Sequence, residues 1–330
     1  MTLKEIAEKT GVSVSAVSKA LAGAPDISEE TRRRIEEVAR ESGYRKTREK
    51  GRKNGTKPLV IAVVTPDMKS RYFAKILECL DEQLYLLNGR LAVGCSRYDA
   101  ELEAQYLNRF CGDSYIDGIV LITPYNGVDS IPKGRVPIVA ISQTDQTISQ
   151  YDAIKVDDSC GIQQAVERFL ELGHRKIAYI GERLTYSRLN YFRSAMNACG
   201  EKPDESMMLV SNKRSEEAGY ESMVKLIEGN NLPTAIFAAY DSIASGAMSA
   251  MSEHGIRVPE DVSVVGFDNV TNVFRYNGKL STIDCHIDDQ TQIALSILKK
   301  KIYRQEFTAV QNITIKTELV ERSSLAKVRE

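Results

Sequence analysis

From Pro58 onward, short apolar runs alternate with stretches of helical spacing, and this alternation limits the possible folds more than any other feature of the chain. The run at 59–64 is continuously apolar, as expected of a parallel strand that is covered on both faces. Further strands are expected at 89–95, 118–122, 137–141, 176–180, 235–238 and 262–266, with helices near 72–87, 100–110, 161–172 and 189–199. The pattern predicts an α/β fold with doubly wound parallel sheets in two similar subdomains, and a ligand cleft at the carboxyl ends of the strands.

The first 44 residues follow a different pattern, which is typical of three short helices. Gly11 allows the left-handed conformation of a tight turn after the first helix. Ser13 is placed to cap a second helix over 14–21, and Ser28 is placed to begin a third. Three such helices form a helix-turn-helix unit, although they also suit any small helical bundle.

Charge is divided unevenly between this head and the rest of the chain. Residues 1–57 hold 14 Lys/Arg and 9 Asp/Glu and carry +5, so the remainder carries −6 of the total of −1. A basic head suggests contact with a polyanion, and a solvated charged face is the alternative. Residues 45–57 include seven basic residues and form a linker with almost nothing apolar. Phosphate binding, which would make DNA affinity strongly dependent on salt, and a flexible tether both remain open for it.

Composition also narrows the function. No stretch approaches the roughly 20 apolar residues of a membrane span, and the N-terminus lacks the apolar segment of a signal peptide. We therefore expect a cytoplasmic, nucleoid-associated protein rather than a secreted solute-binding protein. The six cysteines are scattered without a C-x-x-C pair, which indicates free thiols and no metal site. No dinucleotide or P-loop motif occurs, so neither a cofactor nor catalytic residues are expected and an enzyme is disfavoured.

Two consecutive segments of the head carry a family resemblance. The run TLKEIAEKTGVSVSAVSKALAG, followed by ISEETRRRIEEVARESGY, resembles the DNA-binding domain of the LacI/GalR repressor family. The resemblance continues in LGHRKI at 172–177, GIRVPEDVSVVGFD at 255–268 and LSTI at 280–283. It implies a sequence-specific transcription regulator that binds operator DNA as a homodimer.

The resemblance also implies a domain organisation. The helix-turn-helix domain would span 1–44, the basic hinge 45–57, and the effector-binding and dimerisation domain 58–330. The last of these would have the type I periplasmic-binding-protein-like fold. Its N-subdomain would comprise 58–157 with 286–312, and its C-subdomain 158–285 with 313–325.

Roles in DNA binding follow from the same resemblance. Base choice would fall to Val14, Ser15 and Lys19, and backbone contacts to Ala16, Ser18 and Tyr44. Lys19 stands where Arg or His is common, and it can donate to guanine without the bidentate fork of arginine. Lys53 stands where the family has a leucine that wedges into the minor groove. We therefore expect weakened intercalation, with Arg52 and Lys53 on phosphates instead.

Effector contacts are implied for six residues of the body: Ser70, Tyr72, Ser142, Arg188, Tyr240 and Asp268. A structural ion pair across the cleft is the alternative for Arg188 with Asp268, and core packing is the alternative for Tyr72. Ser142 and Tyr240 replace the Asp and Asn that many sugar sensors of the family carry. The expected effector is therefore a nucleoside, an aryl glycoside or a larger sugar, in a repressor of a carbohydrate or nucleoside utilisation operon.

Overall fold

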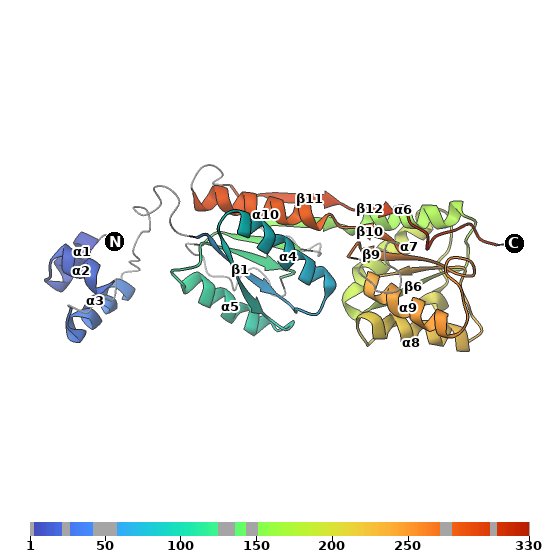
Figure 1. Ribbon diagram of the computed structural model, residues 1–330, viewed down its shortest axis with the longest axis horizontal. Coiled ribbons are helices and arrows are strands. Elements are labelled where there is room, and N and C mark those ends of the chain that lie inside the picture. Colours follow the sequence, from blue (N-terminus) through green and yellow to red (C-terminus); the bar gives the residue numbers. More distant parts are fainter. Residues whose placement is uncertain are drawn as a thin grey trace. The chain divides into compact units, whose positions relative to one another are not determined.

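The computed structural model describes residues 3–21, 27–41, 58–124, 136–142, 151–270, 279–303 and 309–329. The chain divides into two compact units, Met1–Pro58 and Leu59–Glu330 (Figure 1). The described part of the first unit contains helices α1 (Leu3–Thr10), α2 (Val14–Ala20) and α3 (Glu29–Glu41).

The three helices of the head enclose a small apolar core. Ile6, Val17 and Ile35, one from each helix, are fully buried in it. The expected turn and cap are present, since Gly11 has φ of 67° and the Ser13 Oγ accepts the Ala16 amide at 3.1 Å. The pattern of the sequence therefore predicted both the local and the packed structure of this unit.

The second unit holds two six-stranded sheets. The first has the order β11-β5-β4-β3-β1-β2 and is parallel throughout. Its strands are β1 (Val60–Thr65), β2 (Arg90–Cys95), β3 (Gly118–Ile122), β4 (Ile138–Ser142), β5 (Asp152–Asp157) and β11 (Asn312–Lys316). The second has the order β12-β10-β9-β8-β6-β7, in which only β12 runs antiparallel. Its strands are β6 (Ile177–Glu182), β7 (Met208–Ser211), β8 (Ala235–Ala238), β9 (Ser263–Asp268), β10 (Ser281–Asp284) and β12 (Glu318–Val320).

Helices pack against each sheet to make two lobes (Figure 1). In the first lobe these are α4 (Arg71–Leu86), α5 (Ala100–Gly112) and α10 (Ile287–Ile302). In the second lobe they are α6 (Asp158–Glu171), α7 (Tyr186–Ala198), α8 (Ser215–Glu228) and α9 (Asp241–Glu253), with short 3₁₀ turns at Arg183–Thr185 and Glu205–Met207. The expected doubly wound α/β architecture is confirmed. Within the described residues, no helix combines the length and the apolarity that crossing a membrane requires.

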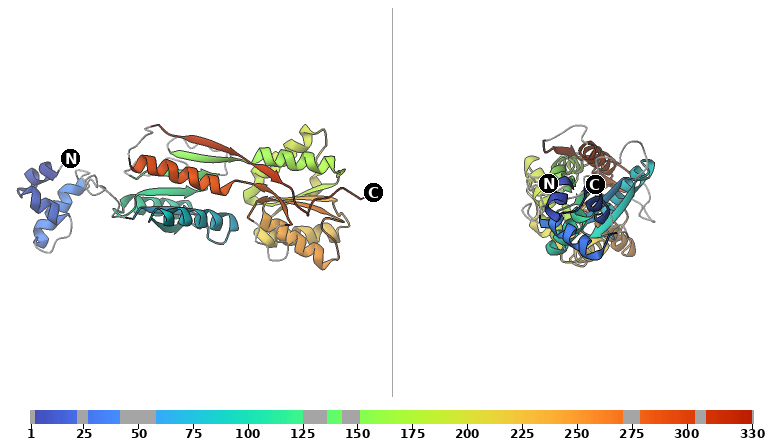
Figure 2. Two further views of the ribbon diagram at one scale, coloured as in Figure 1. Left: turned by 45° about the horizontal axis from the view of Figure 1, so that its top comes forward. Right: turned by 90° about the vertical axis from the view of Figure 1, so that its left-hand side faces the viewer.

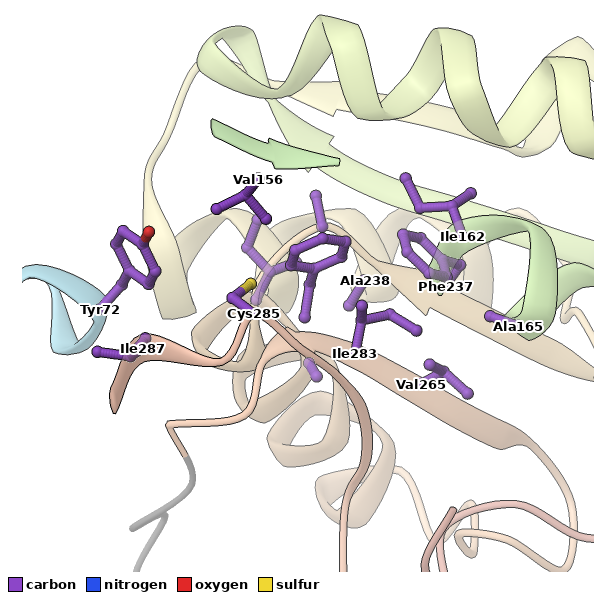
Figure 3. Packing of buried hydrophobic residues seen from close by; sticks show 14 of the residues in the cluster. Tyr72, Val156, Ile162, Ala165, Phe237, Ala238, Val265, Ile283, Cys285 and Ile287 are labelled. Carbon is purple, nitrogen blue, oxygen red and sulfur yellow. The ribbon is translucent and has the colours of Figure 1, made fainter. Parts of the chain in front are cut away.

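The chain passes between the lobes at three places: from β5 into α6, from β10 into α10, and from β11 into β12 (Figure 2). Two of these crossings, β5 to α6 and β11 to β12, are joined by hydrogen bonds. The Thr317 hydroxyl donates to the Asp157 carbonyl at 2.8 Å and accepts the Gly161 amide at 2.9 Å. The buried cluster that packs around them draws side chains from both lobes (Figure 3).

Candidate functional site

Strands of both sheets end at a single cavity of about 1130 Å³. From the first lobe, Asp67 follows β1, Tyr98 follows β2 and Thr123 follows β3. From the second lobe, Arg214 follows β7 and Tyr240 follows β8. A ligand cleft at the carboxyl ends of parallel strands is what this topology favours.

Five of the six residues predicted to contact an effector line this cavity: Ser70, Tyr72, Arg188, Tyr240 and Asp268. Ser142 is different. It is the last residue of β4, its side chain is fully buried, and it is not part of the described lining. The structure therefore brings the first five together at the cavity and does not include Ser142 among them.

Arg188 is the centre of the buried end of the cavity, with 3% of its surface exposed. Its Nε donates to Asp158 Oδ2 at 2.8 Å, and its Nη1 donates to the Ala239 carbonyl at 2.5 Å. Its Nη2 lies 3.5 Å from Asp268 Oδ1 and makes no hydrogen bond. A buried guanidinium nitrogen without an acceptor is costly unless a ligand completes it.

Two aromatic rings flank the same guanidinium. The Phe267 ring centroid is 3.5 Å from Arg188 Cζ, and the Tyr240 centroid is 5.0 Å away. Burial opposes the charged guanidinium, but the carboxylates of Asp158 and Asp268 outweigh it and raise the pKa of Arg188. Arg188 is therefore a rigid, permanently charged donor.

The alternative for Arg188 and Asp268 was an ion pair across the cleft; the ion pair is present, but it lies within the second lobe and does not cross the cleft. Both residues belong to the second lobe, on α7 and β9. The stronger contact of Arg188 is with Asp158, which sequence reasoning missed because the two are 30 residues apart. Burial raises the pKa of Asp268 well above its ordinary value although Arg188 opposes the shift.

Tyr72 is both part of the core and part of the cavity wall. Its ring is 4% exposed and packs with the cluster around Cys285 and Ile287 (Figure 3). Its hydroxyl donates to Gln290 Oε1 at 3.1 Å, and Gln290 Nε2 donates to the Cys285 carbonyl at 2.5 Å. Tyr72 is thus tied to the crossing between β10 and α10.

A polar bridge joins the lobes beside the cavity. Arg214 Nη2 donates to the Tyr98 hydroxyl at 2.8 Å, and its guanidinium lies 4.4 Å from the Tyr98 ring centroid. The Tyr98 hydroxyl in turn donates to Asp67, while Arg214 Nε lies 3.3 Å from the buried carboxylate of Glu182. No local pattern could have revealed this bridge, since Tyr98 and Arg214 are 116 residues apart.

The head presents a separate candidate surface on α2. Val14, Ser15 and Lys19 are exposed, and Ala16 and Ser18 are half-buried. The opposite face of α2 is buried in the core of the head. The remaining predicted DNA contacts, Tyr44, Arg52 and Lys53, lie outside the described residues. Among the described side chains, no group of three or more His, Cys, Asp and Glu could hold a metal ion.

Comparison with known proteins finds relatives of both parts of the chain. Residues 2–46 match bacterial regulatory proteins of the lacI family, and residues 166–325 match a periplasmic binding protein-like domain. The HTH-type transcriptional regulator DegA of Bacillus subtilis (strain 168) is 32% identical over 278 residues, which cover 81% of this chain and 81% of DegA.

Two further similarities cover nearly the whole chain. The HTH-type transcriptional repressor PurR of Edwardsiella ictaluri (strain 93-146) is 29% identical over 335 residues, which cover 98% of this chain and 97% of PurR. The crystal structure of the lac repressor dimer bound to operator and the anti-inducer ONPF shares the fold, with a TM-score of 0.70 and 24% identity over 99% of both chains. The matched relatives regulate transcription, which excludes the enzyme interpretation. This chain belongs to the lacI family of bacterial regulatory proteins and is a DNA-binding transcription regulator.

Proposed function

We propose that this regulator represses a carbohydrate or nucleoside utilisation operon, and that a small polar effector in the cavity controls its affinity for operator DNA. The observation that carries the proposal is Arg188 Nη2, which is buried at the cavity wall beside Asp268 and makes no hydrogen bond. A hydroxyl group of a ligand can accept from this nitrogen and donate to the Asp268 carboxyl group.

The lining also limits how an effector is held. The Tyr72 ring is 4% exposed and its hydroxyl is already bonded to Gln290, so stacking on Tyr72 is a minor contribution. Tyr240 is half-buried, and its ring also lies against Arg188. Recognition therefore depends on hydrogen bonds to Arg188 and Asp268 more than on a stacked ring, which favours a sugar or sugar derivative over a free base.

On the DNA side, α2 would enter the major groove. Val14, Ser15 and Lys19 would meet base edges, while Ala16, Ser18 and Tyr44 would lie near the backbone. Arg52 and Lys53 would contact phosphates from the linker. The solved lac repressor is a dimer on operator, and we infer the same assembly for this chain, acting at the nucleoid.

The first test is to select operator sequences from genomic DNA fragments with the full-length chain. Selected fragments should share a near-palindromic site, and binding should weaken strongly with rising salt if the linker contacts phosphates. A stable monomer in sedimentation at micromolar concentration, or selection without sequence preference, would contradict this part of the proposal.

The second test is a thermal shift of the full-length chain against sugars, sugar derivatives and nucleosides. A ligand at about 100 times its dissociation constant adds about 2.7 kcal/mol of stability. Asp268→Asn keeps the size of the side chain and should reduce this gain. Arg193→Ala is the control, because Arg193 belongs to the same lobe as Asp268 but pairs with Glu205 at the surface. Equal loss of binding in both variants would count against the cavity.

A further inference from the structure

The two ends of the cavity differ in charge. At the buried end the charged lining residues are one cation and two carboxyl groups, Arg188 with Asp158 and Asp268. The exposed and half-buried lining holds four cations and two carboxylates: Lys69, Arg71, Arg97 and Arg214 with Asp67 and Glu216. The outer end therefore favours an anion more than the inner end does.

Some of the outer charges already have partners. Arg214 lies against the buried Glu182, and Arg71 Nη2 is 3.8 Å from Glu216 Oε1. Asp67 accepts the backbone amides of Lys69 and Ser70 at 2.8 and 2.7 Å, and the Tyr98 hydroxyl as well. These contacts fix the wall, and they leave little of its negative charge to repel a bound anion.

Lys69 and Arg97 are the outer cations that remain available. Both side chains are exposed, and neither has an ion pair within the described part of the chain. They follow the adjacent parallel strands β1 and β2, whose final residues Thr65 and Cys95 are register partners. The N-terminus of the 16-residue helix α4 lines the same side, and its amides and dipole add to the positive potential.

The inner end supplies an independent reason to expect a ligand. Arg188 is 3% exposed, and its Nη2 has no hydrogen-bond acceptor although it lies at the wall of the cavity. An anion placed there would meet the carboxyl groups of Asp158 and Asp268. A hydroxyl, which both accepts and donates, would meet a donor and an acceptor instead.

We propose that the effector is a hydroxylated molecule with an anionic group at one end, either a sugar phosphate or a sugar acid. Its hydroxyls bind Arg188 and Asp268 at the buried end, and its phosphate or carboxylate lies between Lys69 and Arg97 at the exposed end. This inference rests on the proposed function, since it assigns a chemical class and an orientation to the effector of that same cavity.

The test is calorimetric titration of the full-length chain with matched pairs. The probes are glucose 6-phosphate and ribose 5-phosphate, gluconate and galacturonate, the neutral parents glucose, ribose and galactose, and inorganic phosphate. At least one anionic compound should bind about tenfold or more tightly than its neutral parent, because it adds charge-assisted hydrogen bonds. A phosphate among the binders identifies a sugar phosphate, and a carboxylate identifies a sugar acid.

Variants assign the anionic end to its residues. Lys69→Gln and Arg97→Gln should each remove about tenfold of the advantage of the anion while leaving binding of the neutral parent unchanged. Lys75→Gln is the control, because Lys75 lies on helix α4, close to Lys69 in the sequence, and pairs with Glu78 outside the cavity. Raising the salt concentration should weaken the binding of the anionic compounds more than the binding of their neutral parents.

Several results would overturn the inference. Neutral parents that bind as tightly as their anionic forms would show that the outer cations take no part. If inorganic phosphate bound as tightly as a sugar phosphate, the inner end of the cavity would take no part in binding. If none of the anionic compounds bound in the titration, sugar phosphates and sugar acids would be excluded as effectors. In each case the proposed regulator stands if operator selection succeeds, and a neutral sugar whose binding depends on Asp268 would preserve its effector site.

Discussion

The two lobes share one strand order and yet contribute to the cavity in different ways. The first lobe lines it with exposed or half-buried polar side chains that stand on loops after β1 and β2, such as Lys69 and Arg97. The second lobe also lines it with the exposed Arg214 and Glu216. In the described lining, however, only the second lobe supplies buried titratable groups of opposite type, Arg188 beside Asp268, which rings and carboxyl groups hold in place. A repeated fold therefore places ligands at the same edge, while packing behind that edge decides whether a charge is rigid or solvated.

The helices of the two lobes also differ in how closely they pack against their neighbours. In the second lobe α8 and α9 approach each other closely at two glycines. A Cβ on Gly219 would lie 1.9 Å from the Ile243 carbonyl oxygen, and one on Gly246 would lie 1.9 Å from the Glu216 carbonyl oxygen. In the first lobe, a Cβ on Gly112 of α5 would meet nothing within 4 Å. The contact between α8 and α9 is thus more tightly constrained than the end of α5.

The largest expected effect comes from breaking the buried charge cluster of the second lobe. Asp158→Ala removes the acceptor of Arg188 Nε and should lower the free energy of unfolding by about 4 kcal/mol, because a buried charge loses its partner. Glu78→Ala, which breaks the exposed first-lobe pair with Lys75, should cost less than about 0.5 kcal/mol. Urea unfolding measures both, and similar losses in the two variants would refute the contrast between the lobes.

The close approach of α8 and α9 predicts the next largest effect. Gly219→Ala should lower the free energy of unfolding by about 3 kcal/mol, because the backbone of α9 must move away. Gly112→Ala should change it by less than about 1 kcal/mol, since the added methyl group meets open space. If Gly219→Ala proved neutral in chemical denaturation, the helix contact would be looser than the structure shows.

A buried acid in the second lobe predicts a dependence of stability on pH. Burial raises the pKa of Asp241 from its ordinary 3.8 to about 7, although Thr282, the Val270 amide and two arginines oppose the shift. The protonated Asp241 carboxyl group therefore contributes to the stability of the folded state. This contribution is present in full below pH 3.8 and is lost as the pH rises to about 7, because Asp241 loses its proton at a lower pH in the unfolded chain than in the folded one.

Asp241→Asn isolates this effect. The difference in free energy of unfolding between the wild type and the variant should decrease by roughly 2–3 kcal/mol between about pH 4 and pH 7. Unfolding in denaturant at a series of pH values measures it. A difference that is constant over this range would show that the carboxyl group titrates normally.

The smallest expected effect concerns the bridge between the lobes. Tyr98→Phe removes the hydrogen bond from Arg214 and the one to Asp67 but keeps the ring against the guanidinium, so the free energy of unfolding should fall by about 1 kcal/mol. The lobes should also open more readily, which solution X-ray scattering of the full-length chain would detect as a larger radius of gyration. An unchanged scattering profile would leave the hydrogen bond with a local role only.

Local patterns were sufficient for the central strands and for the head. The apolar runs that became β1, β3, β8 and β9 were visible because strands buried on both faces contain few polar residues. The sequence did not indicate β11, whose residues alternate between exposed and half-buried, nor β12, which has only three residues. Each depends on a partner strand far away in the chain.

By itself, the sequence determined the family, the doubly wound architecture, and five of the residues that line the cavity, because apolar periodicity, turn residues and motifs act over short distances. Only the tertiary structure decided that Arg188 pairs with Asp158, that Tyr98 meets Arg214, and that Ser142 is buried and does not line the cavity. Such pairings depend on how separate strands and helices pack. Burial then sets the strength of each charge, and burial is a property of the folded chain rather than of any segment.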